Sequence, residues 1–231
     1  MIKTVTALLL CSVSLFVSPI SAALIINEVD YDQPGTDNAE FIELFNQNTT
    51  DIDLSPYSVA LINGNGSSIY EAIALPALNL GAGDYFVICG NSSTVINCDM
   101  TASKNTNLIQ NGAPDAIALL LNDIVQDSMS YEGNTVGYTE GSGSGLEDDA
   151  DFDFMGLSLW PSGITSNQNN VDFIFSCITP GMQNTNQSSS CSAPVTASLL
   201  NSDLPEPASV WLLGLGLLGL SCHHRYKKAR V

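Results

Sequence analysis

Short apolar runs separated by polar turns fill the middle of the chain. They occupy residues 24–29, 41–46, 58–63, 69–74, 84–89, 116–121, 124–131 and 172–175. The segments between them are rich in Pro, Gly, Asn and Asp, as at 33–35, 63–66, 81–84 and 111–112. Many short strands joined by such turns are typical of an all-β sandwich.

One turn is specific enough to predict its geometry. Asn122 and Asp123 separate the runs 116–121 and 124–131, so we expect a hairpin with a two-residue turn there. Outside the two ends of the chain, no stretch keeps an apolar stripe at the helical period. The pattern therefore predicts a fold that is all-β.

The first 23 residues have the composition of a secretory signal peptide. Lys3 is their only charge, 5–17 form an apolar segment, and Ser21, Ala22 and Ala23 are the small residues that a signal peptidase needs. The alternative is an N-terminal membrane anchor, although the apolar segment is short for one. We expect residues 1–23 to be removed on export.

The last 28 residues, 204–231, form a second targeting segment. Pro205, Glu206 and Pro207 precede an uncharged run, 208–222, and the chain ends in a basic stretch, 223–231. As a helix, 208–222 would span about 22 Å, whereas a bilayer core requires about 20 residues. This favours a transient transmembrane helix that is lost on cleavage, with the basic tail in the cytoplasm.

This three-part end resembles the PEP-CTERM sorting signal of Gram-negative bacteria. The resemblance implies that an exosortase processes the chain at Pro205, Glu206 and Pro207. It also implies an inner-membrane protein that faces the periplasm before processing and is then at the cell surface or outside the cell. The polar stretch 185–203 is expected to link the membrane segment to the domain at 24–184.

Blocks along the exported domain resemble a lamin-tail domain. They are Ile25-Ile26-Asn27-Glu28-Val29-Asp30-Tyr31-Asp32 with Gly35-Thr36-Asp37, Glu40-Phe41-Ile42-Glu43-Leu44-Phe45-Asn46, Asp51-Ile52-Asp53-Leu54-Ser55 with Tyr57-Ser58-Val59, Leu80-Gly81-Ala82-Gly83-Asp84-Tyr85-Phe86-Val87-Ile88, and Asp172-Phe173 with Thr179-Pro180-Gly181-Met182-Gln183-Asn184. The resemblance implies an immunoglobulin-like β-sandwich that serves as an interaction module. Many relatives carry a basic residue where this chain reads Ser158-Leu159-Trp160-Pro161, so the partner of that cation must be satisfied differently here.

Charge is segregated along the chain. All 24 acidic residues lie between Glu28 and Glu206, and Lys104 is the only basic residue in that span, which gives it a net charge of −23. Nucleic-acid binding depends on Lys and Arg contacts to phosphate, so nucleic acid is excluded as a partner. Solubility is the simpler use of such a surface, and binding of divalent cations is the alternative.

Four cysteines remain once Cys11 and Cys222 are assigned to the targeting segments. Cys89, Cys98, Cys177 and Cys191 allow three pairings in an oxidising compartment. We favour Cys89 with Cys98 and Cys177 with Cys191, because each pair is close in sequence and flanks a polar loop. Their spacing does not match a zinc site, and the exported part has no histidine to complete one.

The exported part has no histidine and no arginine, so no catalytic residue is assigned. Histidine-activated nucleophiles and arginine clamps are both ruled out by this composition. Paired carboxylates could still hydrolyse glycosides, which keeps a carboxylate-based hydrolase as the alternative function. Glu43 lies between Phe41 and Phe45 on one strand face, where we expect a structural carboxylate rather than a catalytic one.

Two acidic clusters are candidates for calcium, which prefers six to eight oxygen ligands. Asp30, Asp32, Asp37 and Glu40 lie between the first two expected strands, and their alternative is a solvated loop of locally hydrogen-bonded side chains. The second cluster, 147–154, follows the Gly/Ser stretch 141–145. We expect it to be a mobile insertion, with a calcium-ordered loop as the alternative.

Together these features predict an exported, exosortase-sorted protein with a non-enzymatic module and no required cofactor. The expected partners are the secretion machinery, the exosortase and exopolysaccharide or other surface components. A calcium-dependent adhesive domain is a further alternative.

Overall fold

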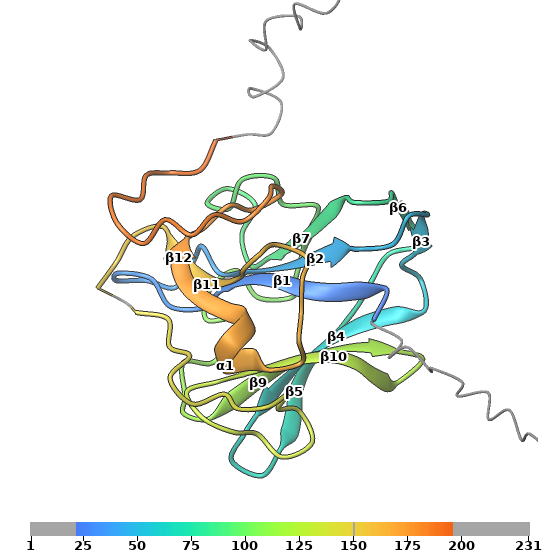
Figure 1. Ribbon diagram of the computed structural model, residues 1–231. Coiled ribbons are helices and arrows are strands. Elements are labelled where there is room, and N and C mark those ends of the chain that lie inside the picture. Colours follow the sequence, from blue (N-terminus) through green and yellow to red (C-terminus); the bar gives the residue numbers. More distant parts are fainter. Residues whose placement is uncertain (1–21, 150, 196–231) are drawn as a thin grey trace, which may run out of the picture.

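The computed structural model describes residues 22–149 and 151–195. In these ranges the chain forms twelve strands and one short helix (Figure 1). The elements are β1 (Leu24–Asp30), β2 (Phe41–Asn46), β3 (Ile52–Asp53), β4 (Tyr57–Asn63), β5 (Ser68–Ala74), β6 (Asn79–Leu80), β7 (Tyr85–Cys89), β8 (Met100–Thr101), β9 (Asp115–Leu121), β10 (Ile124–Tyr131), β11 (Met155–Leu159), α1 (Asn169–Asp172) and β12 (Phe173–Cys177).

Two sheets lie face to face, which confirms the all-β sandwich (Figure 1). The larger sheet has the strand order β12-β11-β1-β2-β7-β8, and the smaller has the order β10-β9-β4-β5. Every pairing in these two sheets is antiparallel except that of β7 with β8. The short strands β3 and β6 pair with each other outside both sheets.

Buried aliphatic side chains from both sheets fill the space between them. Val29 and Leu44 of the larger sheet and Leu61 and Ile117 of the smaller one are fully buried in this core. β-branched and aliphatic residues suit this position because they pack well on a pleated surface. Apolar burial of this kind, at roughly 25 cal/mol per Å², is the main stabilisation of the domain.

The hairpin prediction is also confirmed. Asn122 and Asp123 join β9 to β10 and have positive φ angles of 49° and 65°. Both central residues of this turn therefore adopt the left-handed conformation that matches the twist of the flanking strands. Asn and Asp tolerate that conformation better than most residues with a Cβ.

Strand β11 is absent from the sequence-based expectation. All five of its residues are buried, and the alternation of Met155, Leu157 and Leu159 with two small residues is too short to stand out in the sequence. Gly156 and Ser158, together with the acidic run before it, give the segment the composition of a loop. Its place beside β1 in the larger sheet is therefore visible only in the structure.

The prediction of a mobile insertion is wrong for residues 141–149. Leu146 is buried in the main core and Asp148 is 6% exposed. The amide of Gly143 donates to Asn134 Oδ1, and its carbonyl accepts from the amide of Gly133. The segment packs on the sandwich because two of its side chains are buried there.

No helix among the described residues is long and apolar enough to cross a membrane. The signal peptide expected at 1–23 lies outside them except for its last two residues. The transmembrane helix expected at 208–222 lies wholly outside them, as do Pro205, Glu206 and Pro207.

Candidate functional site

A row of buried carboxyl groups lies on the outer face of the larger sheet, the face turned away from the smaller sheet. Glu28 of β1 and Glu43 of β2 are directly opposite each other in the antiparallel pairing. Phe41 and Phe45 share this face of β2 with Glu43, as expected from the alternation along a strand. Both glutamates are fully buried, so another part of the chain must cover them.

The cover is the segment that follows β12, residues 178–184. The amide of Thr179 donates to Glu28 Oε2 at 2.8 Å, and the amide of Gly181 donates to Glu43 Oε2 at 2.6 Å. Asn184 donates from Nδ2 to the carbonyls of Asn27 and Leu159, at 2.8 and 2.9 Å. We call residues 178–184 the covering segment.

Side chains of the sheet itself complete the network. Asn27 Nδ2 donates to Glu43 Oε1 at 2.7 Å, and Ser158 Oγ donates to Glu28 Oε1 at 2.6 Å. Ser176 Oγ in turn donates to Ser158 Oγ. The buried oxygens of both glutamates are thus bonded to neutral donors.

No cation takes part in this network. Lys104 is the only basic residue in the described part of the chain, and its Nζ lies 5.6 Å from the centre of the Tyr70 ring. Burial without a cation raises the pKa of Glu28 to about 7, and it raises the pKa of Glu43 well above its usual range. The charge of Glu28 raises the pKa of Glu43 further.

Ser158, in the segment where the sequence analysis expected a departure from the family pattern, lies beside this network. Ser158 is opposite Glu28 in the pairing of β1 with β11. Glu28 accepts hydrogen bonds from the hydroxyl of Ser158 and the amide of Thr179. The carboxyl group is therefore satisfied by neutral donors at this position.

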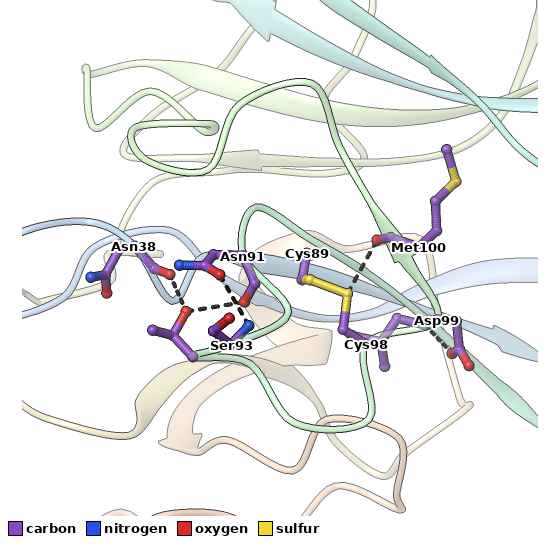
Figure 2. The surroundings of a disulfide bond; sticks show 9 residues. Asn38, Cys89, Asn91, Ser93, Cys98, Asp99 and Met100 are labelled. Carbon is purple, nitrogen blue, oxygen red and sulfur yellow. Dashed lines mark hydrogen bonds between the residues drawn. A yellow bond between two sulfur atoms is a disulfide. The ribbon is translucent and has the colours of Figure 1, made fainter.

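Two disulfides hold the loops that cover the outer face, and they are the expected pairs. Cys89 is bonded to Cys98, and Cys177 is bonded to Cys191. Figure 2 shows the first bond and the neighbouring loop, where the hydroxyl of Thr94 donates to the carbonyl of Asn38. The second bond closes a loop that contains the whole covering segment.

Three of the four carboxylates expected to bind calcium already accept hydrogen bonds from the protein. Glu40 is buried and accepts from the amides of Leu108 and Ile109, at 2.6 and 2.9 Å. Asp30 accepts from Gln33 Nε2, and the amide of Gln33 donates to Asp37.

Asp32 is the fourth of these residues, and its own amide donates to Asp148. Within 22–149 and 151–195, no group of three or more His, Cys, Asp or Glu side chains is placed to hold a metal ion. Calcium binding at Asp30, Asp32, Asp37 and Glu40 stays a prediction that titration can test.

Asp148 is an anchoring residue that sequence reasoning did not single out. Its Oδ2 accepts from the amides of Tyr31 and Asp32, and its own amide donates to the hydroxyl of Tyr31. That hydroxyl donates to Glu132 Oε1, and the Tyr31 ring stacks on Tyr131 with 4.3 Å between centroids. In the sequence, Asp148 is one acid in a dense acidic run, and its acidic neighbours are exposed. No feature of the sequence therefore distinguishes it from them.

The hydrogen-bonded network around Glu28 and Glu43 has a structural role. Glu28 and Glu43 are closed off by the covering segment and already accept hydrogen bonds, so neither faces a cleft where a substrate could meet it. A carboxylate-based hydrolase needs two acids on either side of an accessible bond. The pair therefore fixes the end of the domain to its sheet.

These features define the class: a disulfide-bonded, immunoglobulin-like β-sandwich with buried carboxyl groups on its outer face, beneath the covering segment. The chain belongs to the Lamin Tail Domain family, whose sequence model matches residues 18–133, just over half of the chain. The matched region ends after β10, and β11 and β12 complete the larger sheet beyond it. Comparison with curated proteins gives no match.

A second family matches the C-terminal region. Residues 203–225 match the PEP-CTERM protein-sorting motif, and Pro205, Glu206 and Pro207 lie inside that match. The chain is therefore an exported protein of the kind that an exosortase processes. Both families are non-catalytic domain types.

Proposed function

We propose that this protein is a non-enzymatic interaction module of the cell surface or extracellular matrix of a Gram-negative bacterium. The observation that carries the proposal is the PEP-CTERM motif at 203–225, which follows a β-sandwich cross-linked by two disulfides. Disulfides persist in oxidising compartments outside the cytoplasm, in agreement with export. The chain is held at the inner membrane by 208–222 until an exosortase acts at Pro205, Glu206 and Pro207.

Mass spectrometry of the protein recovered from its host tests the sorting step. We expect the N-terminus near residue 24 and a C-terminus at or close to Pro205–Pro207. A variant with Glu206→Ala should keep its intact end at Val231, whereas Glu147→Ala, an exposed acid in the domain, should be processed normally. If the wild-type chain also ends at Val231, the segment is a permanent anchor and the matrix assignment is wrong.

The absence of catalysis is supported by the composition and by the network. The described residues contain no histidine and no arginine, and the directly opposed acidic pair Glu28 and Glu43 is buried. A screen of the exported protein against polysaccharides should release no reducing ends. If the protein does cleave a polysaccharide, and Glu43→Gln abolishes the activity while the domain stays folded, the protein is a hydrolase and not a non-enzymatic module.

Exopolysaccharide is the surface component that we propose as a partner. The support comes from the sorting motif, since the route that it marks ends among extracellular polymers. Co-sedimentation of the exported protein with polymer from its host should exceed that of a sandwich protein of similar negative charge. Equal recovery of both proteins would remove exopolysaccharide from the proposal and leave another surface component as the partner.

A further inference from the structure

A small pocket opens on the outer face of the larger sheet, next to the covering segment. Its volume is about 200 Å³. Pockets that enclose a drug-sized ligand measure roughly 300–1,000 Å³, so this one has room for a smaller group such as a single side chain. Its walls come from β1, β2 and the loop between them, and from the loop closed by Cys89 and Cys98. Residues of 153–154, 178–180 and 193–194 complete them.

Asp30 lines this pocket and is the third carboxyl group of the buried row. Glu28 and Glu43 receive amide donors from the covering segment, whereas the donor to Asp30 is a side chain of the loop between β1 and β2. Among the described residues, the hydrogen bond that the Asp30 carboxylate accepts comes from Gln33 Nε2, at 2.6 Å. Asp30 is only 1% exposed, so little water is available to compensate for the rest of its charge.

The charged groups around Asp30 are all acidic. Asp148, Glu28 and Glu40 act on it electrostatically, and each of them raises its pKa further beyond the effect of burial. Asp153 also lines the pocket. A buried carboxylate among other carboxylates is stabilised when a cation is placed beside it, and this domain has no cation there.

The walls of the pocket are mostly apolar. Phe41 and Val95 are buried in one small cluster on this face, and Ile178 packs against them. Pro34 and Pro180 add apolar surface. Lysine and arginine have an alkyl stem and a charged head. The stem can bury its apolar surface against such walls, and the head can pair with a carboxylate.

We propose that this pocket binds the side chain of a lysine or arginine that a partner protein presents. The alkyl stem lies against Phe41 and Val95, and the charged head pairs with Asp30. The net charge of −23 between Glu28 and Glu206 attracts a basic partner from a distance. This site goes beyond the proposed function, because it does not depend on where the protein is sorted.

Titration by NMR tests the site with short peptides that contain a single arginine, lysine or citrulline and no other charged group. Citrulline has nearly the shape of arginine but no charge. The exported protein should bind the arginine and lysine peptides at physiological salt, with shifts centred on the amides of residues 33–41 and 94–96. The citrulline peptide should leave those amides unchanged.

Asp30→Asn separates the site from general attraction to an acidic surface. The amide keeps the shape of the side chain and an oxygen for Gln33 Nε2, so the fold should be retained, as circular dichroism can verify. We expect the affinity for the arginine peptide to fall by about tenfold or more, because truncating one partner of a buried charge pair is costly. The matched control is Asp123→Asn, on an exposed turn, which should change the affinity by less than about twofold.

A second variant blocks the pocket without touching its carboxylate. Ala193 lines the pocket and is exposed, so Ala193→Trp should abolish binding and leave the melting temperature unchanged. Equal losses in Asp30→Asn and Asp123→Asn would overturn the proposal, as would the absence of shifts at millimolar peptide. Binding of glucosamine oligomers but not of the peptides would also overturn it and would assign the pocket to an amino sugar.

Discussion

Glu28 and Glu43 lie opposite each other on adjacent strands, fully buried, and each accepts a backbone amide from the covering segment. Like charges at directly opposed positions of a sheet normally destabilise the pairing. Here no cation compensates them, and the groups that satisfy both carboxyls are neutral donors. The arrangement is most stable when at least one of the two carboxyls is protonated, because only one charge then has to be buried.

The first prediction follows from the titration of these groups. The pKa of Glu28 is raised from 4.5 to about 7, and the pKa of Asp148 is raised from 3.8 to about 7, mainly by burial. The folded state therefore binds more protons than the unfolded chain between about pH 4 and pH 7. Its free energy of unfolding must fall as the pH rises through that window. Urea denaturation should give a lower midpoint at pH 8 than at pH 5.

The same experiment with Glu28→Gln identifies the group. The amide resembles the protonated acid, so this variant should lose part of the pH dependence and be at least as stable as the wild type at pH 8. The part that is lost should be on the order of 3 kcal/mol for a group whose pKa moves from 4.5 to about 7. Stability that rises from pH 5 to pH 8 in the wild type would contradict the assignment.

The second prediction concerns Asn184, which fastens the covering segment. It is 2% exposed, and its amide group bonds to Asn27, Leu159 and Thr179. Asn184→Ala removes these bonds and leaves buried carbonyls without donors, so the free energy of unfolding should fall by about 2–4 kcal/mol. Asn48→Ala, at an exposed position, should change it by less than about 0.5 kcal/mol. Equal effects from both variants would show that the covering segment does not stabilise the sheet.

Local features of the sequence predicted the fold well. The strands β2 and β10 have the bounds that their apolar runs indicate, and Asn122 with Asp123 forms the turn that their conformational preferences favour. The disulfide pairs could be anticipated because each joins cysteines that are close in sequence.

The buried network could not be predicted in the same way. The bond from Gly181 to Glu43 joins residues 138 positions apart, and the bonds from Asn184 to Asn27 join residues 157 positions apart. Acidic residues are usually exposed, so nothing in their spacing distinguishes the buried Glu28 and Asp148 from the exposed Glu147. The pairing of distant segments decides which carboxyl groups are covered.

The third prediction compares the two disulfides. Each should contribute about 2–4 kcal/mol by restricting the unfolded chain. Cys89 is fully buried against Phe41 and Val95, whereas Cys191 is half-buried near the end of the described chain. Replacing Cys89 and Cys98 by alanine should therefore lower the melting temperature more than replacing Cys177 and Cys191. Non-reducing peptide mapping checks the pairs, and a link from Cys98 to Cys177 would contradict them.

The last prediction concerns Asp148 and its dependence on pH. Asp148→Ala leaves the buried amide of Tyr31 without its acceptor, which should cost about 1–3 kcal/mol at pH 5. The cost should be smaller at pH 8. The raised pKa of Asp148 means that its charged form, which predominates at that pH, destabilises the folded wild type. Glu147→Ala, one position away and exposed, should have little effect at either pH. Urea denaturation at both pH values measures the difference, and a cost that grows with pH would mean that the charged form of Asp148 stabilises this segment.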